Sequence, residues 1–88
     1  MYTGPPSPDE LRLRYMTLDE ALPRLDRFLH DTYMSGLATV KIIHGKGTGT
    51  LRETVRRVLS KHPLIKGFRA GEKWEGGEGV TVVEFSEK

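Results

Sequence analysis

Hydrophobic positions recur with two different periods along the chain, and the changes of period divide it into elements. Residues 10–14, "ELRLR", alternate in polarity, which predicts a short strand. After Thr17 the apolar residues instead follow steps of three and four, which predicts an amphipathic helix with one face at Leu18, Ala21, Leu22, Leu25, Leu29 and Tyr33. Thr17 and Glu20, within "TLDE", form a capping-box pattern in which each side chain can satisfy the other residue's backbone amide. We expect Pro23 to kink this helix or to shift its start to a later residue, and Gly36 to end it.

The second half of the chain repeats the change from strand to helix. The segment "TVKIIH", residues 39–44, is β-branched and almost continuously apolar, as expected for a strand that is buried on both faces beside a parallel neighbour. "TLRE" at 50–53 is a second capping-box pattern, and it opens a helix to about Lys61 whose apolar face comprises Leu51, Val55, Val58 and Leu59. Pro63 ends this helix. Two further strands are expected at 64–70 and 80–85, and residues 71–79 form the glycine-rich connection between them.

The resulting order, β-α-β-α-β-β, predicts an α/β two-layer sandwich with a mixed four-stranded sheet and two helices. Each helical crossover joins two parallel strands and is expected to be right-handed. The last strand follows a short connection, so we expect it to return antiparallel. The C-terminal ends of parallel strands meet at one edge, where ligands of open α/β sheets usually bind. Three loops, 14–17, 44–50 and 71–79, should therefore converge there.

Composition limits the classes of protein that need be considered. The chain has 88 residues, which is enough for one small domain with a single core. It has no run of about 18 apolar residues and no signal-like N-terminus, so we expect neither a membrane partner nor secretion. The lack of cysteine excludes disulfides and thiolate zinc sites and fits a cytoplasmic location. Three of the five prolines lie in residues 1–9, which we interpret as a linker or disordered tail before a domain at 10–88.

The segment "HGKGTG", residues 44–49, lies between a strand and a helix. Its glycine spacing matches neither the P-loop nor the dinucleotide-binding motif. Glycines nevertheless allow positive φ and a close backbone approach, and the helix that follows presents the positive end of its dipole. Lys46 adds a mobile positive charge. The loop therefore predicts an anion site such as a phosphate site, or else a turn without a ligand.

Three other features near this edge each have two interpretations. His44 can transfer a proton near neutral pH, or it can cap the strand by hydrogen bonding to neighbouring backbone. Arg52 and Arg56, four residues apart, can face a polyanion or simply water. Trp74 can stack on a base or fold back over the core. The carboxylates form no spaced cluster, so the sequence predicts no metal site.

Several segments resemble one known family. "IIHGKGTGTLRETVRRVLSKHP", "GGEGVTVVEF" and "TLDEAL" closely resemble the small MutS-related (Smr) domain. "DRFLHDTYMSG" is similar to the C-terminal domain of the bacterial MutS-like ATPases that act outside mismatch repair. The resemblance runs from about Leu11 to Phe85, and its most specific part is the histidine–glycine motif between strand and helix.

The resemblance implies a fold similar to the C-terminal domain of translation initiation factor three. It also implies nucleic-acid binding and, in several members, endonuclease activity, which nicks DNA or cleaves messenger RNA on stalled ribosomes. The parents of this subtype are dimeric ATPases linked to suppression of recombination and to ribosome rescue. The glycine motif of the family falls on His44, Gly45, Lys46, Gly47, Thr48 and Gly49.

One departure from the family pattern concerns cleavage. The first strand of the family usually reads leucine–aspartate–leucine, then histidine or arginine, then glycine, and the aspartate is implicated in cleavage. Here Arg12 stands in place of the aspartate, Arg14 matches the arginine variant, and Tyr15 replaces the glycine. An arginine cannot act as a general base or bind a metal ion. We therefore expect any cleavage to be weakened.

Two hypotheses about function follow, and they leave open whether the chain is an enzyme. In the first, the domain is an endonuclease: Arg14 and Lys46 hold the phosphodiester, His44 transfers a proton, and Mg²⁺ or Mn²⁺ assists if a divalent cation is needed. In the second, it is a non-catalytic module that docks DNA, RNA or the ribosome to the ATPase domains of a parent protein. Both use the same binding residues, namely Arg12, Gly45, Gly47, Thr48, Gly49, Arg52, Arg56 and Trp74. A purely structural protein–protein module would leave the basic edge unexplained.

Overall fold

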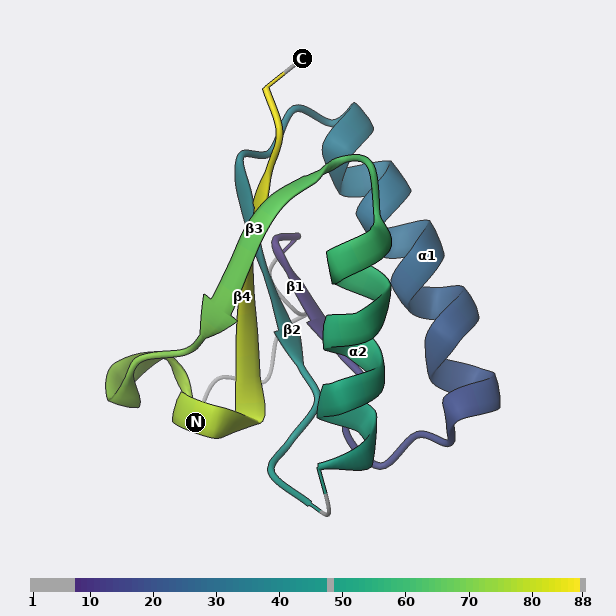
Figure 1. Cartoon of the computed structure of the whole chain (residues 1–88), viewed down its shortest axis with the longest axis vertical. Helices are drawn as coiled ribbons and strands as arrows, with labels where there is room; N and C mark the ends of the chain where they lie inside the picture. The colour runs from purple at the N-terminus through teal and green to yellow at the C-terminus, as the bar shows by residue number, and fades with distance from the viewer. Residues whose placement is uncertain (1–7, 48, 88) are drawn as a thin grey trace.

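The computed structural model describes residues 8–47 and 49–87 and shows a four-stranded sheet with two helices (Figure 1). The elements are β1 (Glu10–Arg12), α1 (Leu18–Met34), β2 (Thr39–Ile43), α2 (Thr50–Lys61), β3 (Ile65–Ala70), the short 3-10 turns η1 (Lys73–Glu75) and η2 (Gly77–Gly79), and β4 (Val80–Phe85). The predicted order and fold class are confirmed. The first strand is two residues shorter than expected, although the Leu13 amide still donates to the Ile43 carbonyl (2.8 Å). Of the expected linker, residues 1–7 lie outside the described residues.

The sheet has the strand order β1-β2-β4-β3. β1 pairs parallel with β2, whereas β4 pairs antiparallel with both β2 and β3. The first three strands therefore run in one direction and the fourth runs in the opposite direction, as expected. The order of strands was not predicted, and β4 is inserted between β2 and β3. The C-terminal ends of β1, β2 and β3 lie at one end of the sheet, together with the start of β4 (Figure 1).

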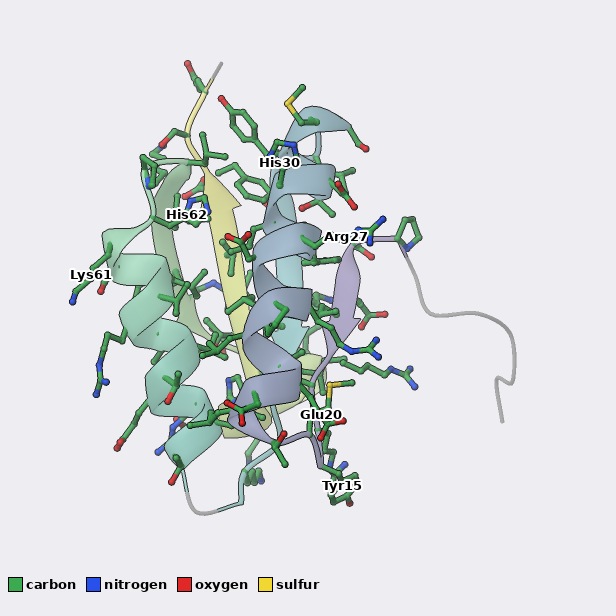
Figure 2. The ribbon with its side chains drawn as sticks, turned by 90° about the vertical axis from the view of Figure 1, so that its right-hand side faces the viewer. Tyr15, Glu20, Arg27, His30, Lys61 and His62 are labelled. Atoms are coloured by element: carbon green, nitrogen blue, oxygen red, sulfur yellow. The ribbon has the colours of Figure 1, made fainter. Side chains whose placement is uncertain are left out.

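Both helices cover the same face of the sheet, as the two perpendicular views show (Figures 1 and 2). Successive right-handed crossovers that advance in one direction across a sheet place their helices on one face. The expectation that residues 39–44 would be buried on both faces is therefore wrong. In β2 Val40 and Ile42 are fully buried beneath the helices, whereas Thr39 is exposed and Lys41 half-buried on the other face.

The core lies between the two helices and the central strands. Its fully buried members include Leu13, which follows β1, and residues of α1 (Leu25, Leu29), α2 (Val55, Leu59), β2 (Val40, Ile42) and β4 (Val83). At about 1.5–3 kcal/mol for each fully buried aliphatic side chain, these contacts are the main favourable term in folding. They fix the helices on the sheet and so fix the loops at its lower end in Figure 1.

The start of α1 is set by the predicted capping box. The Glu20 amide donates to Thr17 Oγ1 (3.3 Å), and the Thr17 amide donates to Glu20 Oε1 (3.2 Å). The helix then continues through Pro23, so the alternative of a later start is wrong. Gly36 follows the helix with φ +85°, a left-handed conformation that suits glycine, as expected for a stop.

The second predicted capping box does not form. Gly49, not Thr50, is the N-cap of α2, with φ +86° and no side-chain cap. Its carbonyl accepts from the Glu53 amide (2.9 Å). A threonine N-cap needs extended backbone, as Thr17 has, whereas the turn into α2 needs a left-handed residue. The glycine therefore takes the position, and the helix begins at Thr50.

Candidate nucleic-acid interface

The three loops that were expected to converge do so, around an open pocket of about 910 Å³. Residues 14–18 line it from the first loop, residues 43–47 and 49–52 from the glycine loop and the start of α2, and Gly76, Gly79 and Val80 from the last connection. The predicted convergence of the three loops is thus confirmed. Segments more than 60 residues apart in the sequence form one concave surface.

The Gly79 carbonyl ties the glycine loop to the last connection. It accepts from the His44 amide (3.1 Å) and from the Gly45 amide (2.9 Å). Gly79 itself approaches closely, since a Cβ there would lie 3.5 Å from the Gly45 backbone. Backbone hydrogen bonds therefore hold together two of the loops that line the pocket.

Gly45 also determines where Arg14 lies. Its φ is +80°, and a Cβ at this position would lie 3.1 Å from Arg14 Cγ. A side chain here would be strained and would push Arg14 aside. The glycine thus lets the Arg14 stem pack against the loop, and Arg14 is one of the residues that line the pocket.

His44 is buried and both of its ring nitrogens are engaged. Nδ1 lies 2.9 Å from the Gly45 carbonyl oxygen, and Nε2 lies 2.8 Å from Thr81 Oγ1. A carbonyl can only accept, so Nδ1 carries the proton and Nε2 of the neutral ring accepts from the Thr81 hydroxyl. Thr81 is fully buried and His44 is 5% exposed. The lone pair that could take a proton therefore points into the core rather than into the pocket.

The electrostatic surroundings keep this ring neutral. Burial is the largest cause that lowers the pKa of His44 below its usual range. The hydrogen bond to Gly45 opposes this shift, while the positive charges of Arg56 and Arg52 add to it. The predicted role of His44 in proton transfer stays a prediction, and the observed contacts instead suit a residue that holds the start of the glycine loop.

The pocket itself is basic. Arg14, Lys46 and Arg52 line it, and no Asp or Glu is among the described residues that do so. Arg52 is partly neutralised by Glu78, whose carboxylate lies 3.3 Å from the guanidinium. Leu51 and Arg52 belong to the first turn of α2, where backbone amides have no acceptor within the helix and the dipole favours an anion. The arrangement fits a phosphate.

Three of the other predicted residues, Arg12, Arg56 and Trp74, are not among the described residues that line this pocket. Arg12 occupies β1 opposite Ile43, and the alternation of the strand places it on the face away from the helices. Arg56 lies one turn after Arg52 in α2, and its buried Nε has no hydrogen-bond partner among the described residues. Trp74 in η1 is 80% exposed, so the alternative that it folds back over the core is wrong. Gly47 lines the pocket, whereas Thr48 lies outside the described residues.

Sequence reasoning missed three residues of this region. The sequence gives a weak indication of Thr81, because this residue brings a hydroxyl group into an apolar strand. Thr81 pairs with Ile42, so it lies on the face of the sheet that the helices cover. Glu78 gave no signal, because only the fold brings it to Arg52. Tyr15 was noted only as the replacement for the glycine of the family pattern. The structure explains why the family has glycine at this position, because the backbone here has φ +69°, a left-handed conformation.

A divalent cation would need carboxylate ligands, and the described residues that line this pocket include none. Among the described residues, no group of three or more His, Cys, Asp or Glu side chains is arranged to hold a metal ion. The cationic lining does not fit Mg²⁺ or Mn²⁺, which prefer carboxylate oxygens. Within the same part of the chain, neither helix has the length and apolar character needed to cross a membrane.

Comparison with known proteins agrees with the fold and the motifs. Curated relatives named Endonuclease MutS2 include those of Pelotomaculum thermopropionicum (53% identical over 77 residues, 88% of this chain) and Geobacillus kaustophilus (52% over 76 residues, 86%). The chain spans about a tenth of the length of these relatives, 10% in both cases.

Two solved structures have the same architecture. One is the Smr domain of Thermus thermophilus MutS2, with a TM-score of 0.86 and 39% identity over 90% of this chain and 99% of that one. The other is YdaL, a stand-alone small MutS-related protein from Escherichia coli, with a TM-score of 0.88 and 25% identity over 93% and 67%. The family model for the Smr domain matches residues 11–86, and the chain therefore belongs to the Smr domain family.

Proposed function

We propose that this domain binds DNA or RNA through backbone phosphates held in the pocket between the three loops. The observation that carries the proposal is the basic lining by Arg14, Lys46 and Arg52 at the first turn of α2. Phosphates are the ligands for which a helix N-terminus, a glycine-rich backbone and convergent guanidinium and ammonium groups are jointly suited. The named activity of the MutS2 relatives, endonuclease, acts on the same class of molecule.

A binding titration tests this proposal. Lys46→Ala removes one charge from the pocket, whereas Arg27→Ala removes the same charge from the exposed surface of α1 (Figure 2). Loss of one phosphate contact should weaken binding of a labelled single strand about 5-fold at about 0.1 M salt. Anisotropy with DNA and RNA strands of the same sequence measures it. Equal affinities of Lys46→Ala and the unaltered domain, or an equal loss in both variants, would count against the pocket.

We further propose that endonuclease activity in this domain is weak. Arg12 stands where the family has an aspartate, and the proton-accepting nitrogen of His44 faces Thr81 in the core. General acid–base assistance is typically worth about a hundred- to ten-thousand-fold in rate, so its loss slows turnover without removing charge stabilisation by Arg14 and Lys46. Arg12→Asp should therefore increase nicking of supercoiled plasmid or cleavage of single-stranded RNA. No gain with either substrate would contradict the assignment of the acid to this position.

The engaged state of His44 also favours a second candidate function, a non-catalytic docking module. In that case the pocket holds nucleic acid or ribosomal RNA for the ATPase domains of a larger cytoplasmic protein, of which this chain would form about a tenth, as it does of its relatives. Suppression of recombination and ribosome rescue would then be activities of that parent. Binding without cleavage by both the unaltered domain and Arg12→Asp would support docking.

A further inference from the structure

Tyr15, at the pocket between the three loops, combines an unusual backbone conformation with an exposed side chain. It is the one non-glycine residue with positive φ in the described part of the chain, at +69°. Its side chain is 90% exposed, and it projects from the end of the molecule at which α1 begins (Figure 2). Both Tyr15 and Arg14 line the pocket, and the Arg14 guanidinium lies over the Tyr15 ring, 5.0 Å from its centroid.

Within the part of the chain that the structure describes, burial does not account for a tyrosine at this position. A left-handed backbone costs an ordinary residue about 1–2 kcal/mol, and glycine would avoid that cost. A ring that is 90% exposed gains almost no burial in return. Strained residues that persist at the edge of a ligand site point to a role in binding. The contact with Arg14 holds one ring face near a cation and leaves the rest of the ring open to solvent.

We propose that Tyr15 is a stacking platform for an unpaired base, next to the phosphate that Arg14 and Lys46 hold. This inference rests on the proposed phosphate pocket and adds the class of substrate. A base in a duplex already has both faces stacked on its neighbours, whereas a base in a single strand is free to stack on an aromatic ring. The domain therefore prefers single-stranded or locally unpaired nucleic acid.

The preference for unpaired nucleic acid depends on two different kinds of surface that lie next to each other at this pocket. Arg14 and Lys46 attract phosphate regardless of sequence, and the Tyr15 ring offers a flat apolar surface that every base can match. Stacking on an aromatic side chain changes affinity by about 5- to 150-fold per base. Trp74, which is also exposed, does not line the pocket, so it does not supply this surface beside the phosphate.

An abasic strand separates stacking from phosphate binding. The domain is titrated with a labelled single strand of mixed sequence and with a strand of the same length in which the central nucleotides lack bases. We expect the unaltered domain and Tyr15→Phe to bind the strand with bases about 5- to 150-fold more tightly. Tyr15→Gly and Tyr15→Asn, which both tolerate the left-handed backbone, should bind the two strands equally.

The ratio of the two affinities distinguishes the inference from the function on which it rests. If the unaltered domain binds both strands equally, the stacking platform is wrong and the phosphate pocket stands. If it binds neither strand at low salt, both are wrong. If Tyr15→Gly keeps the preference for bases, another side chain supplies the stacking and Tyr15 is free to serve a different contact, such as one with a protein partner.

Discussion

Buried, neutral His44 should make the stability of the domain decrease as the pH falls below 6.5. Burial lowers its pKa in the folded domain below 6.5, the value expected in an unfolded chain. As the pH falls below 6.5, the unfolded chain binds a proton that the folded domain does not bind, so acid favours unfolding. The contribution of His44 to stability is thus complete above 6.5 and decreases as the pH falls toward the lowered pKa.

The size of this effect has an upper limit. One pH unit below the unfolded-state pKa, a single group that stays neutral in the folded state can lower the free energy of unfolding by at most about 1.4 kcal/mol. Urea unfolding followed by circular dichroism at about pH 7.5 and about pH 5.5 measures the loss. This range lies above 4.5, the ordinary pKa of Glu20 and Glu75, whose pKa values are lowered further in the fold, so these two carboxylates do not contribute.

His44→Gln is the matched variant. Glutamine keeps a donor and an acceptor for the Gly45 carbonyl and the Thr81 hydroxyl, and it does not titrate. His30 and His62 are present in both proteins. The difference between the two proteins in the loss of unfolding free energy therefore reports on position 44 alone. We expect the variant to lose less stability than the unaltered domain on acidification. An equal loss in both proteins would refute the buried, neutral His44.

Three smaller predictions concern the capping box and the pocket. Thr17→Ala removes the capping box of α1 and should lower the free energy of unfolding by about 1 kcal/mol in urea titrations. Gly45→Ala places a Cβ 3.1 Å from Arg14 Cγ at φ +80°, so it should lower that free energy by about 1–2 kcal/mol and weaken binding as well; unchanged unfolding would contradict the observed conformation. Glu78→Gln frees Arg52 from its ion pair and should tighten binding of a labelled strand several-fold, whereas weaker binding would mean that Glu78 itself orders the site.

The convergence of the three loops was predictable because it depends on chain direction alone. Helical crossovers force parallel strands, and parallel strands bring their C-terminal ends together, whichever strands are neighbours. The order of the strands was not predictable in this way. Periodicity marks β4 as a buried strand, and only its register with Val40 and Phe68 shows that it lies between β2 and β3.

The chemistry of the site was harder to predict than its position. The motif placed His44 correctly at the glycine loop, yet its role depends on Thr81, 37 residues later, which takes its second ring nitrogen. Likewise, the pattern "TLRE" predicted Thr50 as the N-cap of the second helix. The N-cap is instead the preceding Gly49, which has a left-handed backbone. Side-chain contacts between distant segments, and backbone angles set by those segments, leave little trace in the local sequence.

The salt dependence of binding tests the phosphate pocket most directly. For a single strand, each phosphate contact adds about 0.7 to the slope of log affinity against log salt concentration. We predict that Lys46→Ala makes this slope shallower by about 0.7, and that Arg27→Ala, with the same change in net charge, leaves it unchanged. A slope that is the same in Lys46→Ala as in the unaltered domain would show that Lys46 contacts no phosphate and would contradict the account.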